Sequence, residues 1–111
     1  MFERAPIPRK DASGKIISEG DVIELIVPNE GYESEEEKWT LERVQVAFSN
    51  ENCAFMFRCF FARSKHFDFE EILGQKTLDE YKAKIVGNIH EEPWLEHTLG
   101  WKNISEKEIP K

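Results

Sequence analysis

The sequence contains only two cysteines, Cys53 and Cys59, which are too few for a disulfide scaffold. They stand six residues apart in a run that is typical of a strand. This spacing places them on one face of the strand and about 20 Å from each other. A disulfide needs Cα atoms within about 7 Å. The sequence therefore predicts two reduced thiols with structural roles.

Long hydrophobic runs and a targeting signal are missing as well. No apolar run approaches the roughly 18–20 residues of a membrane span. The first residues, Met1 to Pro6, turn polar at once and do not follow the basic, apolar, small-residue order of a signal peptide. We therefore expect a cytoplasmic protein that has no membrane partner.

Basic residues are the minority, 15 against 22 acidic residues, and the net charge is −7. A negative field repels phosphates, which opposes nonspecific binding to nucleic acid. One basic concentration exists near the N-terminus, formed by Arg4, Arg9, Lys10 and Lys15. Together with the ring of Trp39 or Phe61, these basic residues could form a basic and aromatic strip that binds nucleic acid, which is the alternative prediction.

Signatures of catalysis and of metal binding are absent too. The chain has no G-x-S-x-G, no P-loop and no G-x-G-x-x-G, so we expect no enzyme. Two groups of imidazole and carboxylate side chains could be considered as ligands: His66, Asp68, Glu70 and Glu71, and His90, Glu91, Glu92, Glu96 and His97. Neither has a paired-ligand spacing, so the sequence predicts no metal and no cofactor.

The length of 111 residues, with 40% hydrophobic residues and eight phenylalanines, predicts one domain over residues 1–111 that buries a modest core. Pro6 and Pro8 predict that residues 1–12 are an extended, loosely packed arm rather than a helix. Residues 102–111 are polar, and we expect them to be a frayed tail.

Four segments have the composition of strands: 22–27, 39–48, 53–61 and 84–89. The polar residues 49–52 predict a hairpin between the second and the third. In the second, the apolar phase slips between Leu41 and Val44, which indicates a bulge or the end of one strand pairing.

Helices are expected only as short segments. Asp68 before Glu71, and Thr77 before Glu80, have the spacing of capping boxes, which predicts helices near 69–73 and 78–83. Pro93 suits the first turn of a last helix through 94–97. The predicted fold is therefore mainly β, with α+β as the alternative: a small, partly open SH3-like barrel or curled antiparallel sheet with short helices.

Two separated segments carry a resemblance to a known family. Residues 14–23 read GKIISEGDVI and residues 86–95 read VGNIHEEPWL. They resemble the N-G-K-E-I-Y-E-G-D-I-[IV] and I-G-N-I-Y-E-N-P-E-L-L stretches of the YopX-like proteins of bacteriophages and prophages. His90 and Glu92 replace the usual Tyr and Asn, and the resemblance covers about a quarter of the chain. It implies a viral or prophage origin and self-association, and supplies no established activity.

The turn residues of these segments have structural roles available. Gly20 and Gly87 permit bends, while Asp21 and Asn88 can bond to their own downstream backbone in Asx-type turns. We therefore interpret them as structural signatures rather than as a site.

Two surfaces are predicted for partners. The 53–61 strand is apolar on both faces apart from Arg58, so it is either central or faces a partner subunit. Its self-association candidates are Phe55, Phe57, Phe60 and Phe61. The acidic loop offers Glu33, Glu35, Glu36 and Glu37 to a basic host or phage protein. The predicted function is thus that of a noncatalytic accessory protein that acts through protein contacts as a homo-oligomer.

Overall fold

The computed structural model describes residues 6–29, 31, 33–34, 38–60 and 67–109. Strands are the dominant secondary structure of the described residues, and the helices are short, which confirms the mainly β prediction. The strands are β1 (Pro6–Lys10), β2 (Ile16–Ser18), β3 (Asp21–Pro28), β4 (Trp39–Ser49), β5 (Ala54–Phe60), β6 (Phe67–Glu70), β7 (Lys84–Asn88) and β8 (Gly100–Ile104). The helices are α1 (Gln75–Glu80), η2 (Pro93–Thr98) and η3 (Glu106–Glu108).

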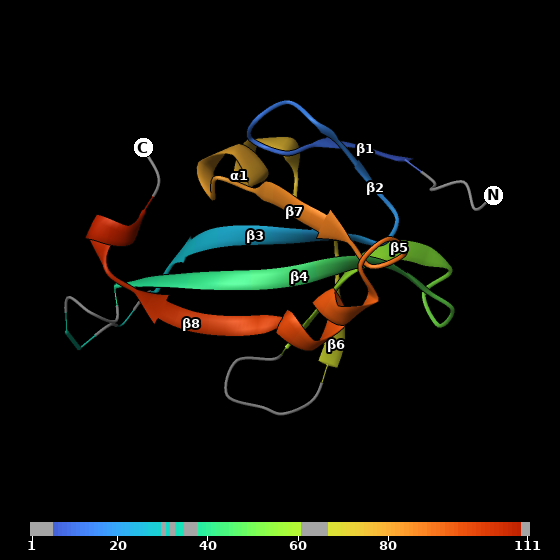
Figure 1. Cartoon of the computed structure of the whole chain (residues 1–111). Coiled ribbons are helices and arrows are strands. Elements are labelled where there is room, and N and C mark those ends of the chain that lie inside the picture. The colour runs from blue at the N-terminus through green and yellow to red at the C-terminus, as the bar shows by residue number, and fades with distance from the viewer. Residues whose placement is uncertain (1–5, 30, 32, 35–37, 61–66, 110–111) are drawn as a thin grey trace.

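Six of the strands form one antiparallel sheet in the order β6-β5-β4-β3-β7, and β8 also pairs with β4 (Figure 1). β1 and β2 form a separate antiparallel ribbon. The predicted antiparallel sheet with short helices is confirmed, and the sheet is not closed into a barrel.

The long strand β4 changes its neighbour along its length. On one side, residues 39–45 pair with β3 without a register shift. On the other side, residues 39–43 pair with β8 and residues 45–49 pair with β5. The phase slip predicted between Leu41 and Val44 therefore marks the end of one strand pairing, and none of these three ladders has a bulge there.

The main core lies on one face of the sheet, which we call the inner face. Ile23, Val44 and Phe57 stand on it, because directly paired residues share a face. The β1–β2 ribbon and α1 cover this face with fully buried Ile17 and Leu78. Each such side chain stabilises the fold by about 1.5–3 kcal/mol.

The opposite, outer face of the sheet carries a smaller core beneath η2. Val22 is fully buried there against Leu95 and Leu99. An ion pair between Arg58 of β5 and Glu96 of η2, 2.8 Å long, also joins the helix to the sheet. Pro93 lies in the first turn of η2, as the sequence predicts. The outer face remains open beyond η2, over β3, β4, β7 and β8 (Figure 1).

The first capping-box prediction is wrong, and the second is wrong about the cap, although a helix overlaps its range. Residues 67–70 form β6, which pairs with residues 57–60 of β5, so the long-range ladder overrides the local helix signal at Asp68. The next helix, α1, begins at Gln75 rather than Thr77. Its N-cap is Gly74, and no side chain caps it.

The chain ends also differ from the predictions. β1 is extended, but it pairs with β2, and Ile7 is only 6% exposed, so the described part of the arm is packed rather than loose. The frayed tail is wrong for residues 102–104, because β8 pairs with β4 and Ile104 is 4% exposed. Within the described residues, no helix is long and apolar enough to cross a membrane.

Candidate binding site

The two segments that resemble the YopX-like family lie side by side, in what we call the motif junction. Asp21 of β3 pairs with Asn88 of β7, and both side chains are buried. The Asn88 amide donates to the Asp21 carboxylate and to the Glu19 carbonyl, at 3.0 Å each. Its oxygen accepts from the His90 N–H at 2.9 Å, which confirms the Asx-type turn predicted at Asn88.

Asp21 acts differently from its prediction. Its second carboxylate oxygen accepts from the N–H of Ser18, at 2.8 Å, so it bonds upstream backbone rather than downstream backbone. Beside it, Gly20 has φ of +85°, a left-handed conformation. A Cβ at Gly20 would lie 2.6 Å from the His90 ring, whose Nε2 is 2.6 Å from the Glu19 carboxylate. The junction therefore requires glycine at this position.

Asp11 extends the junction, and the sequence analysis did not select it as a site residue. It is 2% exposed, and its carboxylate accepts from the Ser13 hydroxyl at 2.7 Å and from the N–H groups of Ser13, Lys15 and Ile85. Burial raises the pKa of Asp11, but these hydrogen bonds together outweigh it and lower the pKa below its usual value of 3.8. The donor from Ile85 is 74 residues away in sequence, so no local signal could reveal it.

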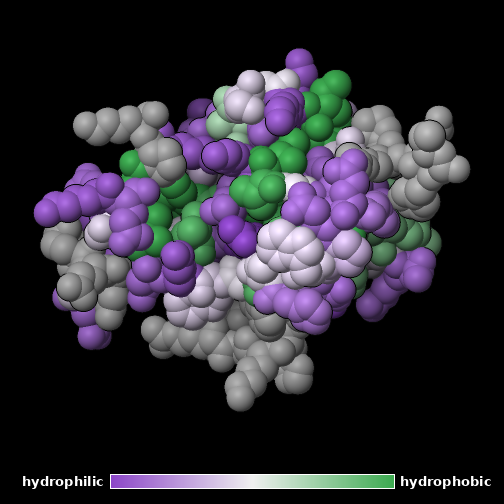
Figure 2. Space-filling model, viewed as in Figure 1, coloured by the Kyte–Doolittle hydropathy of each residue, from purple (hydrophilic) through white to green (hydrophobic). Residues whose placement is uncertain are grey.

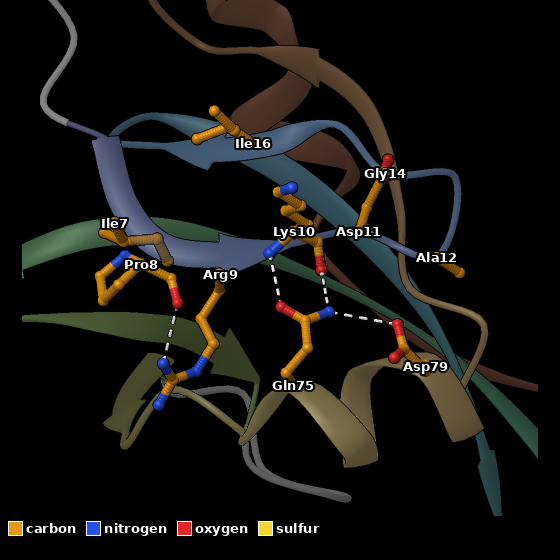
Figure 3. A pocket seen from close by; sticks show the side chains of 10 residues that line it. All are labelled: Ile7, Pro8, Arg9, Lys10, Asp11, Ala12, Gly14, Ile16, Gln75 and Asp79. Atoms are coloured by element: carbon orange, nitrogen blue, oxygen red, sulfur yellow. Dashed lines mark hydrogen bonds between the residues drawn. The ribbon is translucent and has the colours of Figure 1, made fainter.

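A hollow of about 820 Å³ lies between β1, the turn that follows it and α1 (Figure 3). We call it the β1–α1 groove. Its apolar lining comes from Ile7, Pro8, Ala12 and Ile16, and its polar lining from Arg9, Lys10, Asp11, Gln75 and Asp79, with Gly14 at one end. Ile16 is 58% exposed, which leaves a large aliphatic surface open to a ligand.

Side-chain bonds to the backbone hold the walls of the groove. The Gln75 amide accepts from the Lys10 N–H at 2.8 Å and donates to the Lys10 carbonyl at 2.7 Å, as Figure 3 shows. The Arg9 guanidinium donates to the carbonyl of Leu73 at 3.1 Å. These bonds fix α1 against β1 and so keep the groove at a set width.

The lining of the groove combines positive charge with aliphatic surface. Its cations, Arg9 and Lys10, and its aliphatic side chains can receive a segment that carries acidic and apolar residues.

The predicted self-association residues are placed in different environments. Phe57 is 3% exposed and belongs to the core, so its side chain is not available to a partner in this structure. Phe55 is half-buried and packs edge-on against Phe48, with ring centroids 5.4 Å apart. Phe48 is 48% exposed, and the sequence analysis did not select it. Phe61 lies outside the described residues, and for Phe60 only the backbone is described.

The predicted acidic surface is only partly described. Glu33 is exposed, while Glu35, Glu36 and Glu37 lie outside the described residues. Of the four basic residues near the N-terminus, Arg9 and Lys10 line the β1–α1 groove, Lys15 is exposed, and Arg4 lies outside the described residues.

The two sets of ligand candidates were also compared with the structure. Among the described residues, no three His, Cys, Asp or Glu side chains gather closely enough to hold a metal ion. His66 lies outside this description. In the second set, Glu96 pairs with Arg58, whose hydrogen bond and charge lower the pKa of Glu96.

No protein-family model, no curated protein and no solved structure matches this chain.

Proposed function

We propose that this chain is a noncatalytic binding protein that holds a segment of another protein in the β1–α1 groove. One observation carries the proposal: an open hollow of about 820 Å³ combines the exposed Ile16 with the cations Arg9 and Lys10. An acidic segment with one bulky apolar side chain would bury Ile16 and place carboxylates beside the two cations. Recognition sites commonly pair apolar surface with a few placed charges.

The wider role that we propose follows from the resemblance of residues 14–23 and 86–95 to the YopX-like family. It is that of a phage or prophage accessory protein, active in the cytoplasm of a bacterial host as a homo-oligomer. In this proposal, self-association uses a surface other than the β1–α1 groove.

The test is affinity capture from a bacterial host lysate, with and without nuclease, by the wild type and by an Ile16→Asp variant. We expect the wild type to recover one protein from both lysates, and the Ile16→Asp variant to lose it. After purification, the recovered protein should bind the wild type and should not bind Ile16→Asp. An Ile109→Asp variant, which changes an aliphatic residue outside the groove, is the control. A recovered protein that binds Ile16→Asp equally well would contradict the proposal.

The second candidate function is a nucleic-acid-binding regulator. It is favoured by the placement of Arg9 and Lys10 together on β1, with exposed Lys15 close in sequence. Such binding should weaken steeply with added salt, and a double change of Arg9→Glu and Lys10→Glu should abolish it. Captured material that disappears after nuclease treatment would support this candidate over the protein-binding one.

A further inference from the structure

A second hollow, of about 270 Å³, lies on the outer face of the sheet, and we call it the lysine groove. Its rim carries Lys82 and Lys84 at the β7 side and Lys102 on β8. Ile26 on β3 and Leu41 on β4 lie between them, in one row with Lys102. In Figure 2, hydrophobic atoms over this part of β3, β4 and β8 have hydrophilic atoms on both sides.

The positive charge of the lysine groove is only partly balanced within the chain. Glu24, which also lines it, is bonded to Arg43 at 2.9 Å, so Glu108 is left to offset three ammonium groups. Within the described part of the chain, none of the three lysines forms an ion pair. All three are exposed, although the protein as a whole has a charge of −7. The groove is therefore a local cationic site on an acidic molecule.

Lys82 has a backbone conformation that a lysine rarely adopts. Its φ is +52°, in the left-handed region, directly after α1. Glycine is the usual residue at this position of a helix end, because it has no Cβ to be strained there. Strained backbone is often found where a side chain has a function. The structure thus holds an ammonium group at the rim at a cost in conformational energy.

The inner face carries a surface of the opposite charge, which we call the acidic patch. Glu42 of β4 stands directly opposite Trp101 of β8, so their side chains share this face. Glu70 of β6 stands opposite Phe57 on the same face. Burial and the nearby charge of Glu70 raise the pKa of Glu42, so the two carboxylates repel each other. No described cation pairs with either, and Trp101 is 37% exposed beside them.

We propose that the lysine groove binds the acidic patch of a second copy of this chain. Charge complementarity supports this occupant: within the described residues, Lys82, Lys84 and Lys102 form no ion pair with an acid. Glu42 and Glu70 likewise form none with a base in that part of the chain. Shape supports it as well, because exposed Trp101 supplies an apolar group for the aliphatic floor of Ile26 and Leu41. This proposal deepens the homo-oligomer part of the proposed function, and it is independent of what occupies the β1–α1 groove.

The arrangement of the two surfaces fixes the kind of assembly. They lie on opposite faces of one sheet, so a copy that uses its groove still presents its acidic patch. Such a contact is heterologous, and it continues into chains or rings rather than stopping at a dimer. At about 0.15 M salt the screening length is about 8 Å. Salt therefore weakens the long-range repulsion between copies of charge −7, while charge pairs in direct contact at the interface are screened much less.

Sedimentation velocity over a concentration series at about 0.15 M salt tests the proposal. We expect the mass of the wild type to grow beyond that of a dimer. Lys102→Glu and Glu70→Lys should each lower the association constant about tenfold or more, because each places like charges across the interface. Lys76→Glu and Glu80→Lys make the same charge changes at exposed positions of α1, and should associate like the wild type.

Mixing the two interface variants separates this contact from a loss of folding. Lys102→Glu retains an intact acidic patch and Glu70→Lys an intact lysine groove, so an equimolar mixture should form mixed complexes that neither variant forms alone. The double variant, with both charges exchanged, should regain self-association. A wild type that remains monomeric, a dimer that does not grow, or a mixture that stays monomeric would overturn the proposal. Capture of a partner by the β1–α1 groove should survive Lys102→Glu, which distinguishes a failure here from a failure of the proposed function.

Discussion

The motif junction and the lysine groove differ in the environment of their polar side chains, which are buried and hydrogen-bonded at the junction and exposed around the groove. At the junction, Asp11, Asp21 and Asn88 are at most 5% exposed, and every one has hydrogen-bond partners. Around the lysine groove, like charges gather on exposed lysines that form no ion pair within the described residues. Buried polar groups must be paired to be tolerated, whereas an exposed cationic cluster contributes little to stability. The comparison indicates a structural role for the junction, and it supports the proposal that the lysine groove binds a partner.

Removal of the Asp11 carboxylate is expected to cause the largest loss of stability. Asp11→Ala leaves three N–H groups and a hydroxyl without their acceptor, including the Ile85 N–H from β7. We expect the free energy of unfolding to fall by about 3 kcal/mol. Urea unfolding followed by circular dichroism measures it. Glu80→Ala, at an exposed helix position, is the control and should change stability by less than about 0.5 kcal/mol.

Gly20 and Gly14 form a matched pair that separates backbone strain from steric overlap. Both have positive φ, +85° and +92°, but a Cβ at Gly20 would overlap His90, and a Cβ at Gly14 would meet nothing within 4 Å. Gly14→Ala should therefore cost about 1 kcal/mol, from the left-handed backbone alone. Gly20→Ala should cost about 2 kcal/mol, because the overlap adds to that strain. Equal losses in urea unfolding would argue against a close contact at the junction.

The pH dependence of stability tests the same network without a change of shape. The folded pKa of Asp11 is lowered, so its ionised form stabilises the fold above the unfolded value near 3.8, and this stability is lost as the pH falls through the folded pKa. Asp11→Asn should be less stable than the wild type at neutral pH, and the difference should shrink below pH 3.8. Urea midpoints measured from pH 7 to acid pH give the comparison. A stability difference between Asp11→Asn and the wild type that stays constant over this range would mean that the charge of the Asp11 carboxylate does not stabilise the junction.

The sequence predicts local structure better than it predicts either site. Val22 to Val27 form a strand because β-branched residues dominate there, and the 49–52 turn closes the expected hairpin. β6 was missed because its pairing with β5 outweighs a capping signal at Asp68. β8 was missed because Trp101, Lys102 and Asn103 are exposed and give no alternating pattern.

The sites depend on contacts between segments far apart in sequence. The β1–α1 groove exists because Gln75 bonds Lys10, 65 residues away. The N-terminal basic residues were recognised, but the placement of Arg9 and Lys10 on β1 needs Ile7 to enter the core. The lysine groove joins Lys82 and Lys84 to Lys102 through three strand pairings, which charge counting along the chain cannot reveal.

Lys82→Gly is expected to change the free energy of unfolding least, and it distinguishes most clearly between a residue that serves folding and one that serves binding. A residue that serves only the fold should lose stability when it is replaced. At Lys82 we expect the opposite: glycine removes left-handed strain where the Lys82 and Ala83 N–H groups close the end of α1 on the carbonyls of Asp79 and Leu78. The free energy of unfolding should rise by about 0.5 kcal/mol, since the greater freedom of glycine in the unfolded chain offsets part of the gain.

The same variant should weaken self-association about threefold, because it removes one rim charge from the lysine groove. Cys53→Gly is the matched control, since Cys53 also has positive φ, +50°, in an exposed turn outside both surfaces. It should gain stability without any change in association. A Lys82→Gly protein that is more stable and associates like the wild type would remove Lys82 from the interface. A gain in stability with a loss of association would show that the strain at this residue is retained for the charge that it positions.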